Sequence, residues 1–420
     1  SHEALRQVMY ANLVVRADGE AQRLIRDEVE FDSFRDYVAR VRGELELLVS
    51  NAESPGRRRG VRLISTASRG YDSTAVTAFA TRLGRHVVSY SAARSNTRIP
   101  RLAARWVDSD VFDDDGSEIS RKLGAEPRTL VSGLDGLTAE MESWMLASGL
   151  VSPEVIFWSI FRDAEASDAL TLWFAGHNGD ALWDTKPRAR AMLGDLYRGS
   201  PSGYALAEAR LRYGVLDCSV PYLFATSIAS VHRITMSPEM APWRLGNDYD
   251  RPIPRRLLEE AGVERAAFGF GKKAVAQDFD SPQGAELRRE FFATSAWTRL
   301  GERCYRSVAL GGYLGARAAL YVRARGARGR AAKAQSSATK DWLHERLPAL
   351  DLRRQTFLFS VERLTREVQP MLPKHPRVEA PRSVLRRRGA PNGAPEGAAE
   401  PELGGAGLGA PSHALLTTKS

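Results

Sequence analysis

The segment Ser68-Arg69-Gly70-Tyr71-Asp72-Ser73 combines residue types that together can hold phosphate. Gly70 lets the backbone turn tightly and approach a ligand, and Ser68 and Ser73 offer hydroxyl groups. The first N–H groups of a helix that follows would point at an anion with a favourable dipole. A carboxylate beside phosphates requires a cation between them, so Asp72 predicts Mg²⁺. The Walker pattern GxxxxGK[ST] is absent, and an ordinary turn capping a helix is the structural alternative.

A second polar segment is expected close to this loop. A strand predicted over 61–66 leads into the loop, and a helix predicted over 73–83 follows it. A strongly apolar strand, predicted over 169–174, runs straight into Gly176-His177-Asn178-Gly179-Asp180. Because parallel strands have their carboxyl ends at one edge of a sheet, both segments are expected at that edge.

The other elements continue this alternation. Apolar residues at three- and four-residue steps predict a helix over 32–49. The remaining predictions are strands over 86–92 and 129–131, a helix over 117–123, and helical stretches over 137–146, 155–164 and 286–347. Strands and helices in this order predict an α/β fold, a doubly wound parallel sheet with added helices.

Composition limits the function classes. A chain of 420 residues with 43% hydrophobic and 26% charged residues is ordinary for a globular protein. No stretch approaches the roughly 20 apolar residues of a membrane span, so no membrane partner is expected. The net charge of +9 comes from arginines that are spread along the chain rather than gathered in one patch, which argues against a nucleic-acid partner. A small ligand that carries phosphate would by itself favour a positively charged site.

The two cysteines, Cys218 and Cys304, form no CxxC pair and no disulfide framework. This usage favours a reducing cytoplasm. Cys218 stands in an apolar segment and is expected to be a small buried residue.

The first loop resembles the SGGxDS signature of the ATP-pyrophosphatase (PP-loop) superfamily. Ser68, Gly70, Asp72 and Ser73 match, while Arg69 replaces the first glycine and could hold pyrophosphate by its charge. The resemblance implies a sheet of the adenine nucleotide α-hydrolase type and cleavage of ATP between its α- and β-phosphates.

Three later segments resemble the synthetase domain of asparagine synthetases, in the same order along the chain. They are Ala175-Gly176-His177-Asn178-Gly179-Asp180, residues 217–223, and residues 251–273 with Lys272 and Lys273. Ala181 and Ser219 depart from the family pattern. The resemblance implies that Asp180 joins Asp72 in holding Mg²⁺, and that Lys272 or Lys273 neutralises charge at the α-phosphate.

The resemblance also implies a reaction. A carboxylate, from a small molecule or a peptide, attacks the α-phosphorus of ATP, and an amine or ammonia then displaces AMP to form an amide. The β-lactam synthetase relatives place a tyrosine and a glutamate where this chain has His177 and Asp217, which predicts an imidazole–carboxylate base. The alternative is that His177 only orders its loop.

Three regions are predicted: an N-terminal extension and helix over 1–56, the synthetase-like domain over 57–350, and a C-terminal extension over 351–420, disordered after about residue 370. The residues before the first helix are too few for a glutaminase domain, so the amine is expected from solution or from a separate subunit.

Two other functions stay open. A PP-loop sulfurtransferase or tRNA-modifying enzyme would activate a base carbonyl by adenylation, usually with paired cysteines. A non-catalytic nucleotide-binding subunit of a synthetase complex is compatible with the departures at Arg69, Ala181 and Ser219.

Overall fold

A computed structural model forms two compact units, residues 1–364 and residues 365–420. The residues that it describes are 4–7, 12–16, 20–24, 28–93, 113–131, 134–147, 155–186, 207–269, 281–294, 298–300, 303 and 351–371. The predicted disorder after about residue 370 falls almost wholly outside these ranges.

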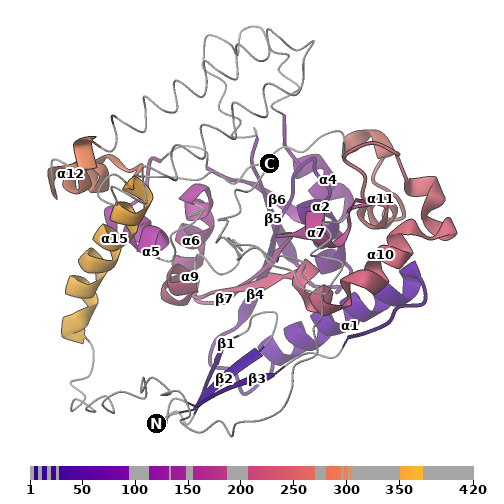
Figure 1. Ribbon diagram of the computed structural model, residues 1–420, viewed down its shortest axis with the longest axis horizontal. Helices are drawn as coiled ribbons and strands as arrows, with labels where there is room; N and C mark the ends of the chain where they lie inside the picture. Colours follow the sequence, from indigo (N-terminus) through magenta and orange to yellow (C-terminus); the bar gives the residue numbers. More distant parts are fainter. Residues whose placement is uncertain are drawn as a thin grey trace, which may run out of the picture. The chain divides into compact units, whose positions relative to one another are not determined.

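Five parallel strands form the central sheet, in the order β6-β5-β4-β7-β8 (Figure 1). Ile64 lies opposite Val88 on one neighbouring strand and Trp173 on the other. From the central strand β4 the chain adds β5 and β6 on one side and then β7 and β8 on the other. The fold is therefore α/β with an all-parallel sheet, which is compatible with the predicted doubly wound topology. The strands are β4 (Val61–Thr66), β5 (Val87–Ser91), β6 (Glu126–Thr129), β7 (Leu170–Ala175) and β8 (Val215–Ser219).

Helices cover both faces of this sheet (Figure 1). Alternate residues of a strand point to opposite faces, so Leu63 and Ile64 belong to two different apolar cores. The first core includes α1 (Phe34–Ala52), α2 (Asp72–Thr81), α4 (Ser117–Lys122), α10 (Ile228–Met236) and α11 (Pro252–Glu259). The second includes α5 (Ala139–Ala147), η2 (Val155–Phe157), α6 (Trp158–Glu165), α9 (Ala207–Tyr213) and α12 (Ala285–Thr294).

The helix that follows loop 68–73 is enclosed by other elements. The apolar stripe predicted for α1 is buried at Phe34, Tyr37, Val41 and Leu45, and the Ser33 hydroxyl caps the helix by accepting from the Asp36 N–H at 3.2 Å. In contrast, α2 is buried from Thr74 to Ala80 on every side, because β4 lies beneath it and α1 and α11 lie against it. Loop 68–73 is therefore joined to a helix that is packed on all sides.

Several elements differ from the sequence prediction. β6 spans Glu126–Thr129 rather than 129–131, because this edge strand pairs with β5 through mostly exposed residues that carry no hydrophobic signal. A separate antiparallel sheet of β1 (Ala4–Gln7), β2 (Asn12–Arg16) and β3 (Ala21–Leu24) was not predicted. Strand β8 and helices α9, α10 and α11 were not predicted either. The short elements also not predicted are α7 (Gly179–Leu182), η4 (Val220–Ser227), η5 (Pro238–Trp243) and η6 (Arg265–Ala267).

Residues 352–371 form α15 (Leu352–Val368) and η8 (Gln369–Met371). Within the first unit, the Arg363 guanidinium lies 3.2 Å from the Glu290 carboxylate, and Phe359 packs on Phe291. Most of the predicted helical stretch over 286–347 lies outside the described residues. Across the part of the chain that is described, no helix has both the length and the apolar character needed to span a bilayer.

A buried hydrogen bond connects α1 to the end of α7. The Trp183 indole N–H donates to the Tyr37 hydroxyl at 2.9 Å, and burial raises the pKa of Tyr37 well above its ordinary value. We expect Trp183→Phe to destabilise the fold by about 1–3 kcal/mol, because the Tyr37 hydroxyl loses this donor inside the core. Urea unfolding measures the change. Adding Tyr37→Phe should cost less than the sum of the single changes, whereas strict additivity would contradict the coupling.

Candidate functional site

The two predicted loops meet where the order of strands reverses. β4 and β7 are neighbours in the sheet but belong to its two halves, so the connections that leave their carboxyl ends run in opposite directions. In open α/β sheets, ligands bind in the crevice at such a point. Loop 68–73 leaves β4 here and loop 176–180 leaves β7.

Hydrogen bonds from serine and threonine hydroxyl groups hold the conformation of loop 68–73. The Ser68 and Ser73 hydroxyls lie 3.1 Å apart, and the Gly70 N–H donates to Ser68 Oγ at 3.0 Å. Thr74 Oγ1 donates to the carbonyls of Ser68 and Gly70. The side chain of Tyr71, at the start of α2, does not cap the helix. The loop therefore brings an uncapped helix end to the crevice, as phosphate binding requires.

The loops touch closely enough to require glycine. A Cβ atom on Gly176 would lie 2.6 Å from the Ser73 backbone nitrogen, and one on Gly179 would lie 2.5 Å from Asp72 Oδ1. The Asp72 carboxylate thus packs directly on the residue before Asp180. The structure thus places Asp72 against the loop that carries Asp180, the second predicted metal ligand.

A buried arginine, Arg251, occupies the centre of this acidic site. Its side chain is only 3% exposed, its Nη1 is paired with Asp72 Oδ1, and its Nε lies 3.9 Å from Asp184 Oδ2. The Tyr249 ring stacks on its guanidinium at 4.9 Å. Burial alone would lower the pKa of Arg251, but Asp72, and to a smaller extent Tyr249 and Asp180, raise it above the ordinary value. One guanidinium therefore balances several carboxylates.

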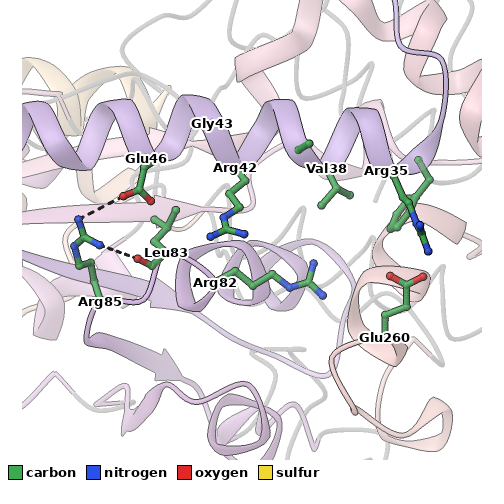
Figure 2. Close-up of a pocket in the computed structure, with 11 residues that line it drawn as sticks. Arg35, Val38, Arg42, Gly43, Glu46, Arg82, Leu83, Arg85 and Glu260 are labelled. Carbon is green, nitrogen blue, oxygen red and sulfur yellow. Dashed lines mark hydrogen bonds and ion pairs between the residues drawn. The ribbon is translucent and has the colours of Figure 1, made fainter.

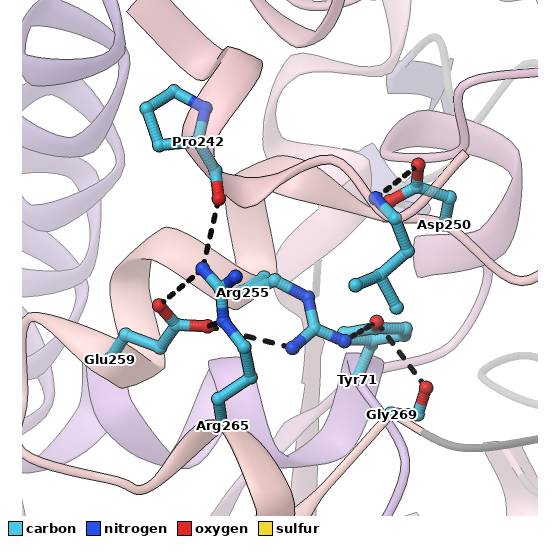
Figure 3. Close-up of polar contacts among 8 residues, drawn as sticks. Tyr71, Pro242, Asp250, Arg255, Glu259, Arg265 and Gly269 are labelled. Carbon is cyan, nitrogen blue, oxygen red and sulfur yellow. Dashed lines mark hydrogen bonds and ion pairs between the residues drawn. The ribbon is translucent and has the colours of Figure 1, made fainter. Parts of the chain in front are cut away.

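A second arginine, Arg255 of helix α11, contacts Tyr71 of loop 68–73 (Figure 3). Arg255 follows Arg251 by four residues, a spacing that places both on one helix face. Its Nη2 donates to the Tyr71 hydroxyl, which in turn donates to the Gly269 carbonyl at 3.4 Å. Gly269 has φ +78°, and a Cβ there would lie 2.5 Å from the Tyr71 ring. Gly269, which precedes Lys272 and Lys273 in the sequence, thus packs against Tyr71 of loop 68–73.

Arg69 braces the loop from the other side. Its Nη1 lies 2.5 Å from Asp113 Oδ2, and its Nε donates to the Ala267 carbonyl at 3.2 Å. Its backbone N–H donates to Asp114, and its carbonyl accepts from the Gly269 N–H at 2.9 Å. These contacts give Arg69 a structural role in this loop.

His177 and Asp217 lie in one polar cluster, which also contains an arginine that sequence reasoning missed. Asp217 Oδ2 lies 3.4 Å from Arg210 Nη1, and both side chains are at least nine-tenths buried. The Trp173 ring contacts His177 and also lies under the Arg210 guanidinium. Burial lowers the pKa of His177 to about 4, Asp217 opposes this shift and Arg210 adds to it. The imidazole is therefore neutral at pH 7, the state that a base requires.

The segment after Asp217 holds the second loop in place. The Ser219 hydroxyl donates to the His177 carbonyl at 3.0 Å, and the Asn178 amide pairs with the Tyr222 hydroxyl. Asn178 adopts φ +62°, which an asparagine tolerates better than most residues. Ser219 thus orders the loop that bears His177.

Sequence reasoning missed Arg210, Arg251 as the partner of Asp72, and Asp184. Only Asp184 carried a local signal, since it follows Asp180 by four residues. Lys272, Lys273 and Cys304 lie outside the described residues. Cys218 is buried in the first core, as predicted.

Comparisons of the chain with models of protein families and with curated proteins found no match.

The residues at the crevice fit Mg²⁺ bound together with phosphates. Asp72 and Asp180 supply carboxylate oxygens, and the acidic excess around Arg251 favours a further positive charge. The described residues contain no group of three or more His, Cys, Asp or Glu side chains that could hold an ion. A Mg²⁺ ion here would take its remaining ligands from phosphate and water, as it commonly does.

The low pKa of His177 predicts a pH-dependent stability. The pKa falls from an ordinary 6.5 to about 4 on folding. Between these values the unfolded chain binds a proton that the folded protein does not, so the free energy of unfolding falls as the pH falls. We expect this residue to account for a loss of up to about 3 kcal/mol by pH 4.

Urea unfolding of the wild type and His177→Gln at pH 7, 5 and 4 measures this contribution. The variant should show a shallower fall, while His86→Gln, which removes an exposed surface histidine, should follow the wild type. Parallel curves for wild type and His177→Gln would contradict the assignment.

Proposed function

We propose that this protein is an ATP-dependent, AMP-forming amide synthetase, similar to the asparagine synthetase and β-lactam synthetase branch of the ATP-pyrophosphatase superfamily. It would adenylate a carboxylate, release pyrophosphate and transfer the acyl group to an amine or ammonia. The observation that carries the proposal is the contact of the Asp72 carboxylate with Gly179, beside Asp180, at the switch point of a parallel sheet.

The first step requires alignment and charge balance rather than covalent catalysis. Loop 68–73 would bind the pyrophosphate portion of ATP through its hydroxyls and the uncapped start of α2. Asp72 and Asp180 would hold Mg²⁺, whose charge would neutralise the departing pyrophosphate. Lys272 or Lys273 would stabilise charge at the α-phosphate.

The second step requires a base because an ammonium ion is not a nucleophile. His177 stands on the loop beside Asp180, and its lowered pKa keeps it neutral at pH 7. Arg210 and Ser219 fix its surroundings, the first by pairing with Asp217 and the second by binding its carbonyl. In the proposed reaction His177 accepts the amine proton as nitrogen attacks the acyl carbon and AMP leaves.

The sulfur-transfer alternative receives less support. Its usual chemistry needs accessible paired cysteines, and Cys218 is buried in the apolar core.

The two half-reactions test the proposal separately. Exchange of labelled pyrophosphate into ATP, over a panel of amino acids, N-acyl amino acids and short peptides, measures adenylation, and hydroxylamine traps the activated acid as a hydroxamate. We expect Asp72→Asn and Asp180→Asn to lower exchange by about 100-fold or more, because charge stabilisation at the leaving group is lost.

His177→Ala should keep exchange while amide formation falls by about 10²–10⁴-fold, the usual contribution of a general base. His86→Ala is the matched control and should change neither reaction. Equal loss of both half-reactions in His177→Ala would contradict the base assignment, and release of inorganic phosphate instead of pyrophosphate would contradict the reaction class.

The pairing of Arg251 with Asp72 predicts how the free protein binds a divalent cation. Arg251→Gln frees Asp72 Oδ1 and removes a buried positive charge. We expect Mn²⁺, without nucleotide, to bind this variant about tenfold more tightly than the wild type, or more, because a unit charge at about 4 Å has a strong effect in a partly buried site. Electron paramagnetic resonance of free Mn²⁺ measures the affinity.

Arg255→Gln removes a neighbouring arginine of α11 but leaves the pair with Asp72, so it should change the Mn²⁺ affinity little. The double variant Asp72→Asn/Arg251→Gln should lose the gain. Mn²⁺ affinity that is the same in Arg251→Gln and wild type would show that Arg251 does not compete with the cation.

A further inference from the structure

A basic groove lies at the opposite end of α2 from the phosphate loop (Figure 2). It has a volume of about 730 Å³ and runs between α1, the end of α2 and the end of α11. Val38 and Ala39 give it an accessible apolar lining, while Phe34 and Leu83 are buried beneath them. Because α2 has 10 residues, the groove is separated from the loop by about 15 Å of helix.

Two arginines from different helices meet in the middle of the groove. Figure 2 shows Arg42 extending from α1 toward Arg82 at the end of α2. Burial lowers the pKa of Arg82, Glu260 opposes this shift, and the positive charge of Arg42 adds to it. The two side chains thus bring like charges into the same part of the groove.

Both carboxylates of the groove form their ion pairs with arginines at its ends, although Glu260 also attracts Arg82. Glu46 lies 3.4 Å from Arg85 at one end, and Glu260 lies 2.7 Å from Arg256 at the other. Among the described residues, no carboxylate oxygen lies within 4.0 Å of the guanidinium nitrogens of Arg35, Arg42 or Arg82. Arg82 donates only to the Leu257 carbonyl among the described groups, at 3.3 Å. The middle of the groove therefore has a positive charge that an anionic group would balance.

We propose that this groove binds a short peptide segment with one acidic residue between apolar residues. The acidic side chain would lie between Arg42 and Arg82, a geometry in which two guanidinium groups can hold one carboxylate. Its apolar neighbours would cover Val38 and Ala39. The proposal does not depend on the enzymatic function.

The length of the groove and the charges at its two ends favour a short peptide over other anionic ligands. The α1 residues that line the groove extend from Phe34 to Glu46, about 18 Å of helix, which matches about five to six residues (~18 Å) of extended chain. Glu46 and Glu260 at the two ends would repel a long polyanion such as nucleic acid. A free phosphate ion would leave the apolar lining uncovered.

Fluorescence anisotropy with a labelled seven-residue peptide tests the proposal. The peptide has a central glutamate with leucine on either side and serine beyond, and a second peptide has glutamine in place of the glutamate. We expect the glutamate peptide to bind about tenfold more tightly than the glutamine peptide, because a charge-assisted hydrogen bond is lost in the second.

Arg42→Glu/Arg82→Glu should weaken the glutamate peptide by about tenfold or more and should prefer a peptide with a central lysine. Arg40→Glu/Arg58→Glu changes the net charge equally outside the groove and should bind like the wild type. Arg42→Ala, a change at an exposed side chain, keeps the test valid if the charge reversal disturbs folding. Absence of binding to the wild type at millimolar peptide, equal weakening in both double variants, or equal binding of a single-stranded oligonucleotide would overturn the proposal.

Discussion

The buried ion pair of Arg251 with Asp72 is the interaction on which the rest of the site depends. Removing a charge from water is costly unless the charge is paired. Asp72 stands at the first turn of α2 and Arg251 immediately before the first turn of α11. Their pairing therefore sets how the starts of two helices meet above the sheet. Arg255, one turn further along α11, donates a hydrogen bond to Tyr71 and joins the same helix to loop 68–73.

The second constraint is space. Loop 176–180 can approach loop 68–73 only because glycine occupies both contact positions. A larger residue at 179 would enter the Asp72 carboxylate, and one at 176 would enter the backbone where α2 begins. Adjacent strands bring the two loops to the same edge, and the glycines allow the last few ångströms of approach. The Asp72 carboxylate is therefore fixed both by its packing on Gly179 and by its ion pair with Arg251.

Much of this arrangement could be predicted from local patterns. β4 has the predicted bounds, and the buried stripe of α1 follows the predicted spacing, because hydrophobic periodicity reports burial directly. The loop before α2 was visible in its glycine, serines and aspartate. The shifted edge strand β6 was not, since an exposed strand lacks that periodicity. The partners of the site residues were also beyond local patterns: Arg251 and Asp72 are 179 residues apart, and nothing near Arg210 in the sequence indicates its pairing with Asp217.

The order of strands has a consequence for how the chain reaches its native state. The central strand β4 pairs with β7 across a long separation: Arg62 and Thr171, on facing strands, are 109 residues apart. Contacts at such separations must overcome a large loop-closure entropy before they stabilise anything, which slows folding. During synthesis, β4 and β5 emerge together, while one edge of β4 stays open until β7 follows. The crevice between the two loops is completed only when α11 arrives. A nascent chain ending before residue 251 therefore has an incompletely supported loop 68–73 and an exposed strand edge, a condition that favours aggregation.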